Sequence, residues 1–140
     1  MNVMRYLALW LLAFIFTSAV DAFWHLVVFR KAYTEGMKPL ARMQGDKTAF
    51  KAIPGLVAQV LVVTCIVFLV LYGMQKGQIW EAILIGALCG VLAITVYGFT
   101  NYSLLKDWTL KLTLLEIIWG PTLGAVSGAF VFWLRTLLLR

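Results

Sequence analysis

The 140-residue chain is 63% hydrophobic and only 13% charged. A soluble domain carries about a quarter charged residues, so this composition argues against a soluble fold and favours a membrane protein. The net charge is +6, but the basic residues lie in the connections between apolar runs. Anionic lipid head groups are therefore the expected counter-charge, and we expect no nucleic-acid partner.

Four apolar segments predict membrane-spanning helices at about residues 6–28, 52–75, 80–105 and 110–136. Each is near or above the roughly 20 residues that a helix needs to cross the hydrocarbon core. Backbone polar groups find no water in lipid, so each span must be helical. The predicted fold is an all-α integral membrane protein, a bundle of four transmembrane helices that forms a single domain over residues 1–140.

The first segment has an alternative interpretation. A short basic start, an apolar stretch and the small residues from Ser18 to Ala22 resemble a cleavable signal peptide. The apolar run continues beyond Ala22 to Val28, which is long for a signal peptide. We therefore expect a membrane span here.

The basic residues also predict an orientation. Four spans place both termini and the second connection on one side, with four lysines and arginines, and the other two connections on the opposite side, with eight. The positive-inside rule then predicts cytoplasmic first and third connections and periplasmic termini, in a bacterial inner membrane. The first connection, the basic loop 29–51, is expected at the membrane surface near anionic head groups.

Two acidic residues, Asp21 and Glu116, lie inside predicted spans. An ionised carboxylate in hydrocarbon costs at least about 2.5–3.5 kcal/mol, so such residues normally face the bundle or a cavity. Helical spacing and similar depth predict that both belong to a buried polar cluster in the cytoplasmic half. Its candidate members are Asp21, Trp24, His25, Tyr97, Thr100, Asn101, Glu116 and Trp119.

The cluster has two interpretations. Asp21, Glu116 and His25 are candidate catalytic groups, because His25 lies one helical turn from Asp21 and could exchange its proton. The alternative is structural: the carboxyl groups could be protonated and hold helices together by hydrogen bonds. No serine nucleophile motif, phosphate loop, dinucleotide fingerprint or Cys/His metal motif occurs, so we expect neither a metal nor a cofactor.

Small residues recur on two of the predicted helices at a spacing that permits close backbone contact. This pattern predicts that the third and fourth helices pack through Gly86, Gly90, Gly120, Gly124 and Gly128. Leu123 is expected on a looser or lipid-facing surface of the fourth helix.

Several stretches together resemble the DUF (domain of unknown function) 2177 family of small bacterial membrane proteins. They are Tyr97-Gly98-Phe99-Thr100-Asn101, Leu104-Leu105-Lys106-Asp107-Trp108, Leu112-Thr113, Glu116, Trp119-Gly120, and near the N-terminus Asp21-Ala22, Trp24 and Tyr33. Gly98 stands where the family pattern has an aspartate, and Glu116 where it usually has the shorter acid. The resemblance implies a membrane fold, and the family's activity is uncharacterised.

Three functional hypotheses follow. The leading one is a non-enzymatic module that binds a lipid or packs as a small subunit of a membrane assembly. It rests on the glycine-rich helix faces and the absence of catalytic motifs. The alternative is a membrane-embedded enzyme acting on a lipid or apolar substrate, with the carboxyl groups and His25 in acid–base roles. The third is a proton-coupled transporter acting as a homodimer, because one four-helix unit is small for transport.

Overall fold

The computed structural model describes residues 3–45, 47–49 and 51–139. Within them, four helical stretches are long and apolar enough to cross a membrane, as the sequence predicted. They are Val3–Val28, Ala52–Gly73, Ile79–Leu104 and Leu110–Leu138. The protein is therefore an all-α membrane protein. Arg140, which was counted for the orientation, lies outside the described residues.

Two of the four spans contain a π-helical segment. The first span consists of α1 (Val3–Phe23) and the π-helical η1 (Trp24–Val28). The third consists of α4 (Ile79–Gly90), the π-helical η2 (Val91–Thr95) and α5 (Val96–Leu104). The second and fourth are single helices, α3 (Ala52–Gly73) and α6 (Leu110–Leu138). Single π-turns inside α-helices occur frequently at functional sites.

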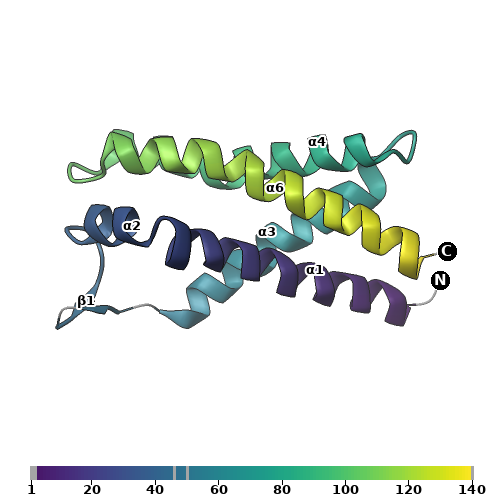
Figure 1. Ribbon diagram of the computed structural model, residues 1–140, viewed down its shortest axis with the longest axis horizontal. Coiled ribbons are helices and arrows are strands. Elements are labelled where there is room, and N and C mark those ends of the chain that lie inside the picture. Colours follow the sequence, from purple (N-terminus) through teal and green to yellow (C-terminus); the bar gives the residue numbers. More distant parts are fainter. Residues whose placement is uncertain (1–2, 46, 50, 140) are drawn as a thin grey trace.

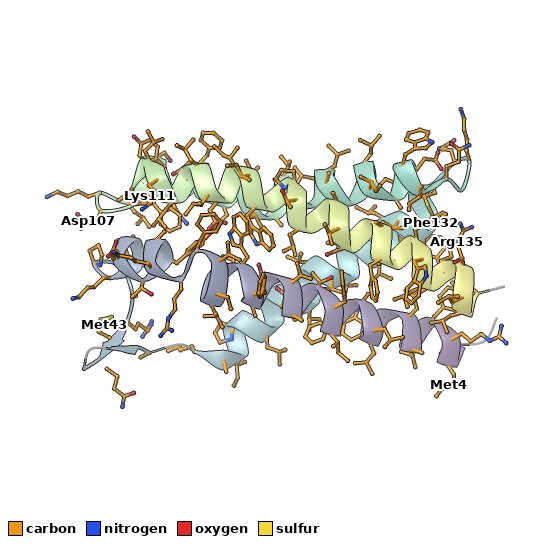
Figure 2. All side chains as sticks on the ribbon, in the orientation of Figure 1. Met4, Met43, Asp107, Lys111, Phe132 and Arg135 are labelled. Atoms are coloured by element: carbon orange, nitrogen blue, oxygen red, sulfur yellow. The ribbon has the colours of Figure 1, made fainter. Side chains whose placement is uncertain are left out.

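The spans run between two ends of the molecule (Figure 1). The termini end holds the start of α1, the turn between α3 and α4, and the end of α6. The loop end holds α2 (Arg30–Met37), the paired two-residue strands β1 (Met43–Gln44) and β2 (Lys47–Thr48), and the turn between α5 and α6. Figure 2 labels Lys111 at the loop end and Arg135 at the termini end, so these two basic residues, one from each group, lie at opposite ends.

Local sequence signals explain where two of the spans begin. Gln78 and Glu81 form a reciprocal capping box at the start of α4. The buried Glu81 carboxylate also accepts the backbone N–H of Lys76 at 3.0 Å, so this acid is satisfied by the chain turn beside it. At the start of α6, the Thr109 hydroxyl accepts the backbone N–H of Leu112 at 3.2 Å.

The helices α4 and α6 approach so closely that only glycine fits between them. A Cβ atom on Gly90 would lie 1.8 Å from the Gly120 carbonyl oxygen, and one on Gly124 would lie 2.0 Å from that of Gly86. One on Gly128 would lie 2.2 Å from the carbonyl oxygen of Ala82. We call this contact the glycine seam; its members are Gly86, Gly90, Gly120, Gly124 and Gly128.

The apolar core lies in the half of the bundle nearer the termini end. It joins all four spans through buried residues: Leu9, Ala13, Val63, Ile66, Val67, Val70, Ala82, Cys89, Val131 and Leu134. All the buried residues of α3 belong to its second half, beginning at Val63. The first half of α3 is largely exposed, and α3 crosses the other helices obliquely (Figure 1). The loop half of the bundle is therefore less tightly closed than the termini half.

The expectation that Leu123 could face lipid was wrong. Its side chain is only 2% exposed and faces a cavity between the helices. The small residues on either side of it let α6 approach its neighbours closely, and this closeness buries Leu123 as well.

Candidate functional site

The Asp21 carboxyl connects the first span to the last. It lies in the final turns of α1, and its Oδ1 accepts a hydrogen bond from the indole Nε1 of Trp119 on α6 at 2.8 Å. Trp119 is 4% exposed, so the contact lies inside the bundle. This bond fixes one oxygen of the acid in a defined direction.

His25 lies beside the same carboxyl, within η1. Its Nδ1 is 2.9 Å from the Asp21 backbone carbonyl oxygen and 3.3 Å from the Asp21 Oδ1. Both oxygens are acceptors, so Nδ1 carries a proton and Nε2 is left for another partner. The His25 side chain is 31% exposed and that of Asp21 is 29% exposed, so both can be reached from the cavities described below.

A set of stacked aromatic rings holds this region to α2. Trp24 and Trp119 stack with centroids 4.3 Å apart and planes 8° from parallel. The Trp24 indole Nε1 donates to the Tyr33 hydroxyl at 3.2 Å, and the His25 ring lies 4.3 Å from the Tyr33 ring. The short helix α2 is therefore tied to the membrane-embedded site through Tyr33.

Glu116 is the second acid of the site and is 6% exposed. Burial raises the pKa of the Tyr33 hydroxyl, and the nearby Glu116 carboxyl raises it further through charge and a hydrogen bond. Gly98 lies directly against Glu116, because a Cβ at Gly98 would be 2.9 Å from the Glu116 Cβ. Glu116, which is longer than the acid usual in the family, therefore fills the space beside Gly98, where the family pattern has an aspartate.

Two neighbouring cavities meet at these side chains. The mouth cavity, of about 580 Å³, lies toward the loop end and is lined by Asp21, His25, Leu26, Arg30, Tyr33, Thr34, Met37, Ala41, Tyr97, Trp108 and Glu116. The inner cavity, of about 210 Å³, is lined by Asp21, His25, Ala58, Gln59, Val62, Ala93, Ile94, Tyr97, Glu116 and Leu123. Four residues line both cavities, and we call them the polar waist: Asp21, His25, Tyr97 and Glu116.

The acids, Tyr97 and Gln59 lie at one depth. Asp21, Gln59 and Tyr97 are each seven residues from the loop end of their spans, and Glu116 is six residues from its own. At 1.5 Å per residue these positions are roughly 9–10 Å inside the spans. Both π-helical segments border this level, since η1 carries His25 and η2 carries Ala93 and Ile94.

The remaining candidates from the sequence lie apart from the cavity lining. Thr100 is exposed, and its hydroxyl donates to the Val96 carbonyl of its own helix at 2.8 Å. The Nδ2 of Asn101 is buried and has no hydrogen-bond partner among the described residues. Neither residue belongs to the lining of the two cavities. Trp24 and Trp119 do not line them either, but Trp119 donates a hydrogen bond to Asp21 and Trp24 stacks on Trp119.

Sequence reasoning missed two contributors to the site. Gln59 is a polar residue in a span without charges, and that contrast was the available signal. Trp108 is 5% exposed, and its indole Nε1 donates to the Thr113 hydroxyl at 3.0 Å. Its place between two predicted spans had suggested only an interfacial aromatic residue.

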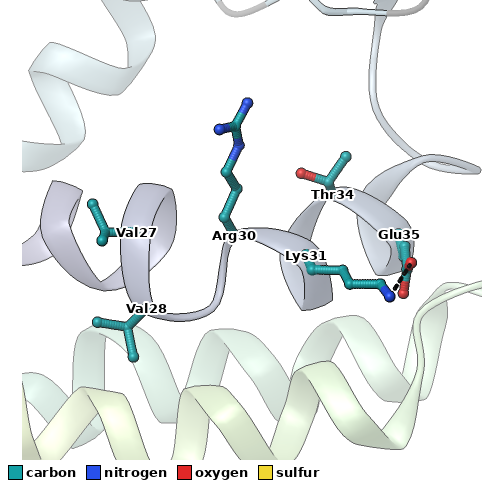
Figure 3. A pocket seen from close by; sticks show the side chains of 6 residues that line it. All are labelled: Val27, Val28, Arg30, Lys31, Thr34 and Glu35. Carbon is teal, nitrogen blue, oxygen red and sulfur yellow. Dashed lines mark ion pairs between the residues drawn. The ribbon is translucent and has the colours of Figure 1, made fainter.

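A shallow hollow lies at the junction between η1 and α2, and Figure 3 shows the side chains that line it. There the Lys31 amine and the Glu35 carboxylate form an exposed ion pair at 3.9 Å. Arg30 points away from that pair in Figure 3 and also lines the mouth cavity. Among the described residues, no group of three or more His, Cys, Asp and Glu side chains is arranged to hold a metal ion.

The fold and the site define a multi-pass membrane protein with a polar cavity between its helices. Residues 6–133 match the family described as Predicted membrane protein (DUF2177), which is nearly the whole chain. The protein belongs to that family, as the sequence resemblance indicated. Neither a curated protein nor a solved structure matches the chain.

Proposed function

We propose that this protein binds a membrane lipid in the two cavities that meet at the polar waist. The observation that carries the proposal is the order of surfaces along the cavities. An apolar inner lining contributed by Ala58, Val62 and Ile94 leads to polar groups at the waist and then to a wider mouth at the loop end. An amphiphile with a hydrocarbon part and a polar head has the same order.

The packing of α3 supports access from the bilayer. Its first half is largely exposed, and Ala58 and Gln59 on this half line the inner cavity. A hydrocarbon chain beside α3 would therefore contact the inner cavity without unfolding any element.

Co-purified lipid tests the proposal. We would extract the protein in mild detergent and measure its bound lipid by mass spectrometry, comparing Ala58→Trp with Ala8→Trp. Ala58 lines the inner cavity, whereas Ala8 is an exposed residue of α1 outside both cavity linings. The proposal expects wild type and Ala8→Trp to retain lipid and Ala58→Trp to lose it. Equal retention by both variants would contradict it.

An enzyme acting on a lipid at the same site is the second candidate. The His25–Asp21 pair favours it, because an oriented carboxylate beside an imidazole is an arrangement used in general acid–base catalysis. Lipid extracts of a deletion strain and its parent separate the two functions. Accumulation of one lipid with loss of another supports the enzyme, whereas an unchanged lipid composition supports binding alone.

We also propose that the loop end faces the cytoplasm of a bacterial cell and that both termini are periplasmic. The basis is the excess of lysine and arginine at the loop end, eight against four. A reporter fused at the C-terminus should be active as a periplasmic protein, and one inserted at Gly45 as a cytoplasmic one. A cytoplasmic C-terminal reporter would reverse the orientation.

A further inference from the structure

The polar waist contains two carboxyl groups, those of Asp21 and Glu116, and among the described residues no lysine or arginine pairs with either of them. Arg30 lines the mouth cavity but forms no ion pair with either acid. The Asp21 carboxyl is paired with the His25 Nδ1 at 3.3 Å, whereas Glu116 has no ion pair among the described residues. An ionised Glu116 carboxylate at this depth would be costly, and a cationic ligand beside it would offset that cost.

The walls around the acids are aromatic on the mouth side. Tyr33, Tyr97 and Trp108 all line the mouth cavity, and the Tyr97 and Trp108 rings meet edge to face with centroids 5.7 Å apart. Aromatic faces attract ammonium groups, most strongly where water is excluded. The carboxyl groups and the aromatic rings that line this cavity therefore both favour a positively charged ligand.

One residue that lines the inner cavity has a hydrogen-bond donor without an acceptor among the described residues. The amide Nε2 of Gln59 is buried and has no partner among the described residues. A buried donor without an acceptor costs about 1–3 kcal/mol, which a ligand oxygen at this position would recover. Gln59 lies at the same depth as the acids and next to the apolar lining of Ala58 and Val62.

We infer that the site selects a phospholipid whose head group ends in a primary ammonium. The ammonium lies among Asp21, Glu116 and the aromatic walls and donates hydrogen bonds to the carboxylates. A phosphate or ester oxygen of the same lipid accepts from Gln59, and the hydrocarbon follows the apolar inner lining. This inference rests on the proposed lipid binding and adds the chemistry of the head group.

Native mass spectrometry of the delipidated protein tests this selectivity. The probes are phosphatidylethanolamine, phosphatidylglycerol and N-acetylated phosphatidylethanolamine with identical acyl chains. Wild type should bind phosphatidylethanolamine at least about tenfold more tightly than the other two, and the N-acetylated lipid isolates the ammonium charge without changing the protein. Equal binding of all three lipids, with loss of each in Ala58→Trp, would overturn the ammonium inference and leave lipid binding intact. No binding of any lipid would overturn both.

Variants then assign the selectivity to side chains. In the double variant Asp21→Asn, Glu116→Gln, the preference should fall to within about twofold, because the amides keep the shape but lose the charge. Gln59→Leu should weaken phosphatidylethanolamine and phosphatidylglycerol by a similar factor and leave their ratio unchanged. A preference retained by a folded double variant would contradict the assignment to Asp21 and Glu116.

Discussion

The two halves of α6 differ in how they contact the neighbouring helices. Toward the termini end, Gly124 and Gly128 place its backbone against α4, where a single methyl group would collide with a carbonyl oxygen. Toward the loop end, Glu116 and Trp119 occupy the space between helices and border or support a cavity. Close packing excludes a ligand from the first half, whereas larger polar side chains leave a cavity in the second.

The other spans show the same division. The apolar core draws on the halves of α1, α3 and α6 nearer the termini end, whereas both π-helical segments lie toward the loop end. Segments of π-helix are frequent at functional sites, and here η1 contains His25 while η2 ends two residues before Tyr97. Regular packing therefore stabilises one half, and local irregularity arranges the site in the other.

The largest expected effect is in the glycine seam. Gly90→Leu or Gly124→Leu should lower the free energy of unfolding in detergent by about 3 kcal/mol or more, because α4 and α6 must separate. Leu114→Ala is the control, since Leu114 is 50% exposed on the same helix. Thermal unfolding followed by circular dichroism measures the difference. Equal melting of the glycine and control variants would show that the seam does not determine stability.

The next effect is at Glu116. Glu116→Leu should destabilise the protein by about 1 kcal/mol, because the half-buried Tyr33 hydroxyl loses the polar carboxyl group next to it. Glu116→Gln keeps an acceptor and should unfold close to wild type. Identical unfolding of the leucine and glutamine variants would remove the argument for a polar contact between α2 and α6.

A pair of similar hydrogen bonds sharpens the comparison between the halves. Thr17→Val removes the buried bond from the Thr17 hydroxyl to Ser127 at 3.0 Å, and Trp119→Phe removes the bond to Asp21. Each should cost about 0.6 kcal/mol, the average for such bonds between membrane helices. Of the two, Trp119→Phe should also weaken lipid binding in native mass spectrometry. If Thr17→Val weakened lipid binding as much as Trp119→Phe, the overall stability of the protein would determine binding, and not the contact with Asp21.

The smallest expected effect is the pH dependence contributed by Tyr33. Its pKa is raised by burial above the ordinary value of 10.0, so the folded state holds this proton more tightly than the unfolded state. The corresponding stability is present below about pH 10 and is lost as the pH rises above it. Tyrosinate absorbance should show a late-titrating component in wild type that Tyr33→Phe lacks. If Tyr33→Phe kept the late-titrating component of wild type, that component would not come from Tyr33, and the Tyr33 phenol would be exposed to water.

The spans could be predicted from the sequence because apolar length and the need for internal hydrogen bonds leave few alternatives in lipid. Asp21, Glu116 and His25 stood out because charged or titratable residues are rare in such segments. Tyr33 stood out only through the family resemblance, since its contact with Trp24 depends on how α2 folds back. The helical spacing that included Thr100 assumed a regular α-helix, and η2 changes that spacing before Thr100 is reached.

Gln59 shows a second limit of the sequence. The sequence does not show whether a single amide in an apolar span has a hydrogen-bond partner. Only the arrangement of the surrounding helices shows that the Gln59 Nε2 is buried without one among the described residues. The burial of Leu123 has the same origin, because it depends on how closely α6 approaches its neighbours.

The most direct test of this division is the melting shift that phosphatidylethanolamine causes in the double variant Asp21→Asn, Glu116→Gln. A ligand that binds the folded state raises its melting temperature. We expect the double variant to melt close to wild type without lipid, and lipid to raise the melting temperature of wild type more than that of the variant. A double variant that unfolds like Gly124→Leu, or one that keeps the full lipid-induced shift, would contradict the separation of a packing half from a binding half.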